Sequence, residues 1–359
     1  MTCSAAHAEY YSLDEDVVVR RIAELKKRHA QEVLFLVHHY QGQAIVDFAD
    51  YVGDSLALAR YAAGEKERRF IVFCGVMFMA QSACALVSKD QKVILPDVSA
   101  GCPLADMGDP SLIEDAWGQL ARAIPGQRVI PVTYVNSDIE LKAFTGKNGG
   151  SACTSSNAGK IFTWALSQGE KIFFFPDRYL GANTAHSLGI GPEEIAVWRP
   201  TEALGGNTVE HLKRARVLVW NGYCHVHFRF RPEDIQTIKA EYPDARVVVH
   251  GECREEVVRL ADGFGSTSFI ISYVEQTPPG TVIAVGTEIH LVKRLSARFP
   301  EKKIIPLSYS MCPNMFKISL HDLLFCLEHL GRVNVVEIPE ATKVGATAAL
   351  RRMLEISGR

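Results

Sequence analysis

Short runs of apolar residues alternate with stretches of helical periodicity along most of the sequence. Residues 16–30 have apolar positions at helical spacing, and a strand follows at 33–37. The longest uncharged stretch, 71–88, is interrupted by Gly75, Gln81 and Ser82, so it predicts a strand and a buried helix rather than a membrane span. Strands that alternate with helices predict an α/β fold with parallel sheets.

The alternating pattern occurs three times with the same order of parts. The three units open at VLFLV, RVIPV and ARVVV, and they close at KVILP, VLVWN and KKIIPL. His38 precedes Ser55 by as many residues as His250 precedes Thr267, which indicates an internal repeat. The middle unit is longer because it holds a Gly-rich segment, 181–208, which we interpret as an insertion or a lid.

The two ends of the chain fall outside this repeat. Residues 1–15 predict a poorly ordered tail ahead of the first helix. Beyond Leu320 the sequence predicts a helix (LHDLLFCLEHL), a strand (NVVEI) and a final helix. We expect these last elements to pack back onto the first unit.

Composition narrows the class of protein. The 359 residues are 47% hydrophobic and 22% charged, with a net charge of -2, which is typical of a globular protein with an ordinary core. The balance of charge lacks the basic excess of a general nucleic-acid binder, so we expect small-molecule partners and neither a nucleic acid nor a membrane. The first residues hold no cationic start followed by an apolar run, so we expect a cytoplasmic protein. Its nine cysteines, irregularly spaced, favour reduced thiols over disulfides.

Three cysteines stand at equivalent places in the repeat. Cys102, Cys224 and Cys312 each follow an apolar strand in a loop. Three thiols at three strand ends predict a metal site, because a disulfide takes only two cysteines. Zinc with three thiolates and a water fits this pattern, and so does a [4Fe-4S] cluster with one open iron. The remaining cysteines within the repeat favour core packing (Cys74, Cys84) or stay undecided (Cys153, Cys253), and Cys326 beyond it also favours the core.

Small polar residues precede a helical run in every unit. Ser55 lies in GDSLALA, Ser155 in CTSSNAGK, and Ser266 with Thr267 in FGSTSFI. Helix N-termini and hydroxyl groups bind phosphate or carboxylate, although plain N-capping explains any one of these residues equally well. The sequence contains no Walker A or dinucleotide fingerprint, so we predict no nucleotide cofactor.

The opening strands of the units end on residues suited to proton transfer and substrate binding. These residues are His38, Tyr40, Tyr134, Asn136, His250 and Glu252. A histidine and a glutamate two positions apart at a strand end supply a general base and an orienting group, whereas a structural histidine is the alternative. Glu288, which follows the strand VIAVG, is a second candidate base.

Taken together, these segments resemble the quinolinate synthases, iron-sulfur enzymes of NAD biosynthesis. The resemblance rests on HHYQ, GDSLALA, LPDVSAGCPLADM, VTYVNS, CTSSNA, WNGYCHVH, HGEC, GSTSFI, VGTE and CPNM in this order. It implies three pseudo-symmetric αβα domains with short parallel sheets around a central site. We place these domains at 16–107 with 318–359, at 108–225 with the 181–208 insertion, and at 226–317.

The resemblance also implies a reaction and a set of site residues. Iminoaspartate, made by an L-aspartate oxidase, condenses with dihydroxyacetone phosphate to give quinolinate, phosphate and two waters. Cys102, Cys224 and Cys312 would hold a [4Fe-4S] cluster whose open iron acts as a Lewis acid. Glu252, His38, Tyr40 and His250 would be catalytic. The substrates would be bound by His38, Ser55, Tyr134, Asn136, Ser155, His250, Glu252, Ser266 and Thr267.

Two positions depart from the family pattern, and two other classes of protein explain part of the sequence. Gly251 stands where the family pattern has proline, and His225 stands where it often has a small residue or proline; neither change removes an expected ligand. His225 and His227 are poor candidates for metal ligands because three thiolates suffice.

A hydro-lyase of the aconitase type would use the same kind of cluster on another substrate. An iron-sulfur sensor or electron carrier would leave the polar helix starts and strand ends without a purpose.

Overall fold

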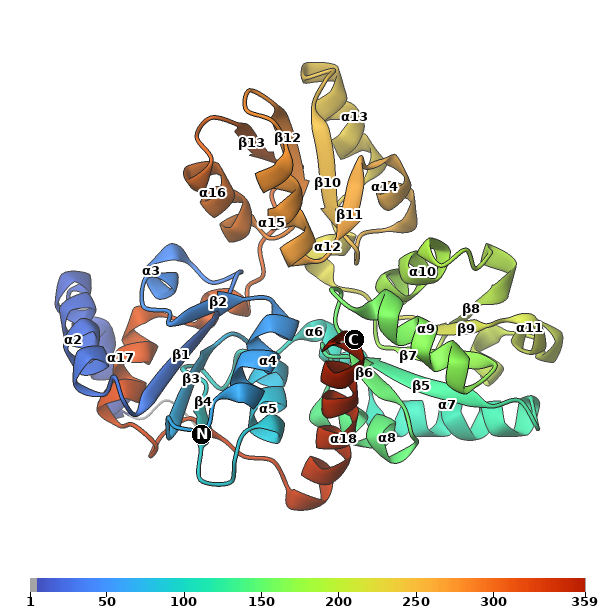
Figure 1. Ribbon diagram of the computed structural model, residues 1–359, viewed down its shortest axis with the longest axis horizontal. Coiled ribbons are helices and arrows are strands. Elements are labelled where there is room, and N and C mark those ends of the chain that lie inside the picture. The colour runs from blue at the N-terminus through green and yellow to red at the C-terminus, as the bar shows by residue number, and fades with distance from the viewer. Residues whose placement is uncertain (1–4, 359) are drawn as a thin grey trace. The chain divides into compact units, whose positions relative to one another are not determined.

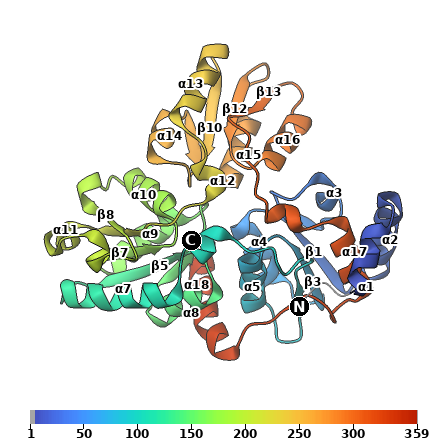
Figure 2. The same cartoon turned by 180° about the vertical axis from the view of Figure 1, so that it is seen from behind.

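The computed structural model describes residues 5–358, which form three sheets covered by helices (Figures 1 and 2). In each sheet the first strand of the repeat lies between the second and the third, and the fourth strand follows the third. This shared order of 2-1-3-4 confirms the internal repeat. The α/β fold class with short parallel sheets flanked by helices is confirmed as well.

The chain divides into two compact units. The first unit ends at Cys102 and resumes at Cys312–Pro339. The second unit comprises Pro103–Met311 and the residues from Glu340 onward.

The first unit is built on a sheet of order β14-β4-β3-β1-β2, in which only β14 is antiparallel to its neighbour. All residues of β1 and β3 are buried, as a parallel sheet covered on both faces requires. The strands are β1 (Val33–His38), β2 (Tyr51–Gly53), β3 (Phe70–Cys74), β4 (Lys92–Ile94) and β14 (Val335–Val336). The helices are α1 (Ala5–Ala8), η1 (Glu9–Ser12), α2 (Glu15–Arg28), α3 (Gln43–Val46), α4 (Ser55–Gly64), α5 (Met77–Leu86), η4 (Met315–Lys317) and α17 (Leu320–Glu328).

The second sheet has the order β6-β5-β7-β9-β8 and is parallel throughout. Its core is aromatic, with Phe173, Phe175, Trp198 and Trp220 buried in one cluster. The strands are β5 (Val129–Tyr134), β6 (Ser151–Cys153), β7 (Lys171–Phe175), β8 (Ile195–Trp198) and β9 (Val217–Trp220). The helices are α6 (Pro103–Asp106), α7 (Pro110–Ala123), α8 (Ile139–Lys147), α9 (Ala158–Gln168), α10 (Arg178–Ser187), η2 (Pro192–Glu194), η3 (Ala203–Gly206) and α11 (Val209–Arg214).

The third sheet has the order β11-β10-β12-β13 and is also parallel. The right-handed crossovers of such a sheet place α14 on one face and α15 with α16 on the other (Figure 1). The strands are β10 (Arg246–His250), β11 (Gly263–Gly265), β12 (Val282–Gly286) and β13 (Lys303–Pro306). The helices are α12 (His225–Phe228), α13 (Pro232–Glu241), α14 (Glu255–Leu260), α15 (Thr267–Gln276) and α16 (Ile289–Arg298).

The final helix, α18 (Glu340–Gly358), belongs to the second unit, so the expectation that it packs onto the first unit is wrong. It lies along α8, as both views of the ribbon show. Gly146 of α8 and Gly345 of α18 let the two backbones approach closely, and Asn157 donates a hydrogen bond to the Ser357 hydroxyl at 2.7 Å. Glycine has no side chain that contributes to an apolar pattern, so the pattern of apolar residues does not predict this contact between α8 and α18.

The close approach of α8 and α18 yields a stability prediction. A methyl group on Gly146 would overlap the backbone carbonyl of Gly345, so we expect Gly146→Ala to lower the free energy of unfolding by about 1–3 kcal/mol despite the better helix propensity of alanine. Gly159 of α9 is the matched control, because a methyl group there has open space around it. Gly159→Ala should be neutral or stabilising by up to about 1 kcal/mol in denaturant titrations. Equal stability of the two variants would contradict the packing argument.

Two other segments differ from expectation. Residues 5–12 are not a poorly ordered tail: they form α1 and η1, and Tyr10 and Tyr11 donate hydrogen bonds to Glu328 and Asp322 of α17. Residues 1–4 of the expected tail lie outside the described residues. Segment 181–208 contributes most of α10 and the whole of β8, so much of it is part of the second sheet and its helical cover rather than a separate lid. None of the helices within 5–358 combines the length and apolarity needed to cross a bilayer.

Candidate active site

Glu252 is the centre of a buried polar cluster in the second unit. It lies in the loop that follows β10, and its side chain is 1% exposed. Its Oε2 is 2.6 Å from Nδ1 of His227 and 3.6 Å from Nδ1 of His250. The two imidazole rings stack with their centroids 4.1 Å apart. The histidine and glutamate predicted at this strand end are therefore together in the fold, and they share a second histidine.

His227 links Glu252 to a hydroxyl group. Its other nitrogen, Nε2, is 3.2 Å from Oγ1 of Thr287, which follows β12 and is fully buried. Carboxylate, imidazole and hydroxyl thus form a chain in which the carboxylate orients the ring and the ring faces the hydroxyl. This is the same order of groups as in a hydrolase triad, where it serves to position an imidazole for proton transfer.

Two buried carboxyl groups in the cluster have opposite pKa shifts. Burial favours a raised pKa for Glu252, but the charges of His227 and His250 and the short hydrogen bond outweigh it, so the pKa of Glu252 is lowered. Burial and the charge of Glu252 together raise the pKa of Asp177 well above its ordinary value. The two shifts therefore favour the ionised form of Glu252 and the protonated form of Asp177.

Tyr134 lies beside this pair at the end of β5. It is buried, and burial raises the pKa of its phenol well above the ordinary value, with the charge of Glu252 adding to the shift. The phenol is consequently a donor and not a base at neutral pH. Asn136, two residues further on, has a buried Oδ1 without a hydrogen-bond partner among residues 5–358. An unsatisfied buried acceptor of this kind calls for a ligand or a water.

Asn183 holds the backbone on both sides of Glu252. This buried residue of α10 donates one amide hydrogen bond to the Gly251 carbonyl at 2.9 Å and another to the Cys253 carbonyl at 2.8 Å. The position of the Glu252 loop is therefore set by a side chain from another helix.

We expect Asn183→Leu to destabilise the protein because it leaves two buried carbonyl groups without donors. The expected loss is about 1–3 kcal/mol in the free energy of unfolding. Ser187→Ala in the same helix removes only a local bond to the Asn183 carbonyl on an exposed side chain, and it should cost less than about 0.5 kcal/mol. Comparable losses in the two variants, measured by denaturant unfolding, would show that the bonds to the loop contribute little.

The predicted hydroxyl residues of the second unit follow the second strand of their repeat, β6 or β11. They differ in burial and in whether they cap a helix. Ser266 is the N-cap of α15 and accepts a hydrogen bond from the Phe269 amide at 3.1 Å, so its capping role is confirmed and its hydroxyl hydrogen is still available to donate. Thr267, the first residue of α15, is also buried. Ser155 is half-buried in the turn between β6 and α9.

The first unit repeats the turn that carries Glu252. The Tyr40 amide donates to Nδ1 of His38 at 3.2 Å, just as the Glu252 amide donates to Nδ1 of His250 at 3.3 Å. In both turns Nδ1 accepts this bond, which leaves Nε2 as the ring nitrogen that faces other partners. Ser55, at the start of α4, is half-buried, and the cap of that helix is supplied by Asp54.

The described cysteines fall into two groups by burial. Cys102 and Cys312 in the first unit and Cys224 in the second are half-buried, and so is Cys84, which was expected in the core and whose thiol donates to the Val336 carbonyl at 3.3 Å. Burial raises the pKa of Cys326 to about 12 and also raises the pKa of the buried thiols of Cys74, Cys153 and Cys253. A buried, protonated thiol is a poor metal ligand. The three strand-end cysteines are thus more exposed than these four, and metal binding requires a thiol that can lose its proton.

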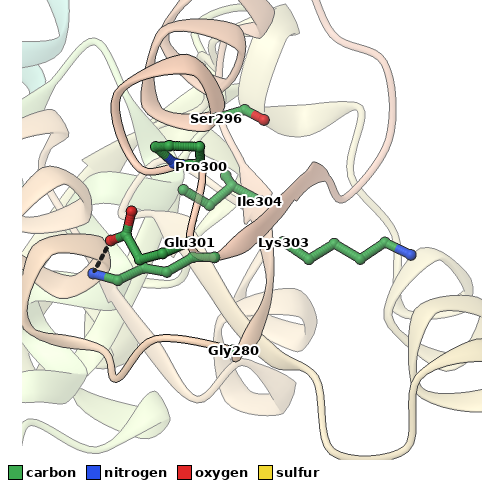
Figure 3. Close-up of a pocket in the computed structure, with 7 residues that line it drawn as sticks. Gly280, Ser296, Pro300, Glu301, Lys303 and Ile304 are labelled. Atoms are coloured by element: carbon green, nitrogen blue, oxygen red, sulfur yellow. Dashed lines mark ion pairs between the residues drawn. The ribbon is translucent and has the colours of Figure 1, made fainter.

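A hollow of about 470 Å³ lies elsewhere in the second unit (Figure 3). Gly280, Pro300, Glu301 and Lys303 line it near the amino ends of β12 and β13. Ligand sites of parallel α/β sheets form at the carboxyl ends of strands. Lys302 pairs with Glu301 at 3.9 Å and donates to carbonyls at the end of α15, so this lysine has a structural role.

Sequence reasoning missed three members of the cluster. His227 was weighed only as a metal ligand, and Thr287 and Asp177 were not considered. Both Thr287 and Asp177 follow the third strand of their repeat unit. Their signal in the sequence is their position at the carboxyl end of a strand, the same signal that marked Glu288 directly after Thr287.

The sequence of the chain matches one protein family over nearly its whole length. A family model described as Quinolinate synthetase A protein (NadA) matches residues 20–355. The quinolinate synthase of Acidobacterium capsulatum is 47% identical over an alignment that covers 99% of this chain and 97% of the relative. The quinolinate synthases of Corynebacterium glutamicum and Bacillus cytotoxicus are 44% and 43% identical, each over 97% of this chain and 90% and 95% of theirs.

Proposed function

Because the chain belongs to the quinolinate synthetase A family and is thus an enzyme, we propose that it forms quinolinate from iminoaspartate and dihydroxyacetone phosphate. Phosphate and two waters are released on the route to NAD, and an L-aspartate oxidase supplies the first substrate. The observation that carries the proposal is the buried chain of Glu252, His227 and Thr287 in a member of this family. A condensation followed by two dehydrations needs a group that repeatedly takes up and returns protons.

A [4Fe-4S] cluster held by Cys102, Cys224 and Cys312 is part of the proposal. Three half-buried thiols, each in a loop after a fourth strand of the repeat, fit the donor set of a cluster with one open iron. When bound, the cluster supplies a Lewis acid toward an oxygen or nitrogen of the substrate. We further propose that each sheet with its helices is one domain and contributes one cysteine, the domains being 16–107 with 318–339, 108–225 with α18 in place of its expected assignment to the first domain, and 226–317.

Glu252 is assigned the main acid/base role. Its lowered pKa keeps it ionised at neutral pH, and its buried Oε1 has no hydrogen-bond partner among residues 5–358, so that oxygen is the one that takes a proton from the substrate. Oε2 stays bonded to Nδ1 of His227. Thr287 fixes the far side of the ring, so that the imidazole moves a proton along a set direction. The raised pKa of Tyr134 keeps its phenol protonated, so that it acts as a hydrogen-bond donor that stabilises the ionised Glu252.

The substrates carry carboxylate and phosphate groups, which must be bound by donors. In the second unit we assign this role to the side chains of Tyr134, Asn136, Ser155, His250, Ser266 and Thr267. Ser266 and Thr267 act at the N-terminus of α15, where amide groups and the helix dipole favour an anion. His38, Tyr40 and Ser55 are assigned the same role from the first unit, and Nε2 of His38 is its donor atom.

The proposal is tested by measuring quinolinate formation with protein purified and reconstituted without oxygen. Iminoaspartate is generated in the assay from L-aspartate by an aspartate oxidase, and the rate is expressed per mole of cluster. Product that depends on both substrates is the expected result. An intact cluster without product would overturn the proposed reaction and point to a hydro-lyase acting on another hydroxy acid.

A further inference from the structure

Three side chains of the second unit form a second arrangement of metal-binding atoms. The thiol of Cys224, one ring nitrogen of His227 and one carboxylate oxygen of Glu252 all lie within 4.8 Å of one another. Cys224 is the N-cap residue of α12, His227 is on that helix, and Glu252 follows β10. Only one member of this trio belongs to the cysteine set assigned to the cluster.

The spacing of these atoms is close to what a single small cation requires. Zinc binds sulfur at about 2.3 Å and nitrogen or oxygen at about 2.0–2.2 Å in a tetrahedron, which places neighbouring ligand atoms about 3–4 Å apart. The present atoms, all within 4.8 Å of one another, are at or slightly beyond that spacing. A cysteine, a histidine and a carboxylate are also the ligand types that zinc takes in proteins, and three ligands leave a fourth position open.

We propose that Cys224, His227 and Glu252 form a mononuclear site for a zinc-class divalent ion when no cluster is bound. Oε1 of Glu252 is buried and has no hydrogen-bond partner in the described part of the chain. Burying such an oxygen without a partner is costly, and a bound cation removes that cost. The orphaned oxygen is an observation independent of the spacing, and it points to a positively charged ligand.

Thr287 supports the histidine as a ligand. Metal-bound histidines are usually held by a hydrogen bond at the nitrogen that does not bind the metal. Oγ1 of Thr287, 3.2 Å from Nε2 of His227, provides such a bond and leaves Nδ1 for the ion. Nδ1 is also the nitrogen that faces Oε2 of Glu252 at 2.6 Å, so an ion held by Nδ1 and by both carboxylate oxygens would replace the proton between His227 and Oε2 and would also give Oε1 a partner.

The mononuclear ion and the cluster exclude each other, because both take the thiolate of Cys224. This consequence rests on the proposed function, whereas the mononuclear site itself does not. A zinc-class ion bound before the cluster assembles therefore takes one of the three cysteines of the cluster site, Cys224. It also takes His227 and Glu252, which are assigned to proton transfer. The clusterless protein is expected to be sensitive to zinc in a way that depends on His227 and Glu252.

The site is tested on clusterless, reduced full-length protein by titration with Co²⁺ and then with Zn²⁺ against a chelator of known affinity. One equivalent of Co²⁺ should bind with a thiolate charge-transfer band and intense tetrahedral bands, and Zn²⁺ should displace it. Cys224→Ser should abolish the charge-transfer band. His227→Gln and Glu252→Gln should each weaken Zn²⁺ binding by more than about 100-fold, and Thr287→Val by about 10–100-fold, as expected for an outer hydrogen-bond partner.

Cys102→Ser and Cys312→Ser are the matched controls, since they remove cluster ligands and leave the trio complete. They should bind Zn²⁺ as tightly as the unchanged protein, and circular dichroism verifies that every variant is folded. If Zn²⁺ binding is lost in these controls, or is unchanged in His227→Gln and Glu252→Gln, the trio is not the site.

In a second experiment, prior loading with Zn²⁺ should lower iron and sulfide incorporation in proportion to occupancy. Full incorporation with Zn²⁺ retained would refute the exclusion while leaving the mononuclear site in place.

Discussion

Replacing Cys102, Cys224 or Cys312 by serine is expected to give a folded protein that assembles no cluster. A serine hydroxyl stays protonated at neutral pH and offers a hard oxygen in place of the soft thiolate that iron-sulfur clusters bind. Each variant should therefore lose nearly all of its iron and acid-labile sulfide after reconstitution, together with the visible absorbance of the cluster. The measurement is iron and sulfide per chain beside the unchanged protein.

Cys84→Ser is the control for this series. Cys84 is also half-buried, and its thiol donates to the Val336 carbonyl at 3.3 Å, a bond that a hydroxyl group makes equally well. This variant should keep full iron and sulfide content. A strand-end variant that also keeps full content would remove that cysteine from the ligand set, and equal loss in Cys84→Ser would point to a folding defect.

Glu252→Gln is expected to keep the cluster and lose turnover by about 10²–10⁴-fold, the range that a positioned acid/base group contributes. Glutamine has nearly the same shape and still accepts the hydrogen bond from His227, so the loop held by Asn183 should keep its place. It cannot take up a proton. Quinolinate formation per mole of cluster, with iron content measured on the same sample, separates this effect from loss of the cofactor.

Glu288→Gln separates the two candidate bases. Glu288 is fully buried, caps α16 through the His290 amide at 2.8 Å and also contacts Nδ1 of His290, so its carboxylate already has a structural role. We expect turnover within about tenfold of the unchanged enzyme and a loss of about 1 kcal/mol in the free energy of unfolding. Normal turnover in Glu252→Gln with a large loss in Glu288→Gln would transfer the base to Glu288.

The sequence by itself determined the fold class and most of the residues at strand ends. Apolar runs of strand length alternating with helical periods are a local property, and the repeated order of motifs is visible in one dimension. Because parallel strands bring their carboxyl ends to one edge of the sheet, Tyr134, His250 and Glu252 could be named before any coordinates. The resemblance to a family added the chemistry of the substrates, which periodicity alone does not indicate.

Only the tertiary structure decided which residues surround Glu252 and where the last helix packs. His227, Asp177 and Asn183 reach Glu252 from segments far from it in sequence, and no local pattern marks such contacts. The pairing of α8 with α18 depends on Gly146 and Gly345, because only residues without a side chain let the two backbones approach so closely. Burial raises the pKa of both Glu252 and Asp177, and the neighbouring His227 and His250 reverse the shift at Glu252, because the energy of each ionised group depends on neighbours that the folded chain supplies.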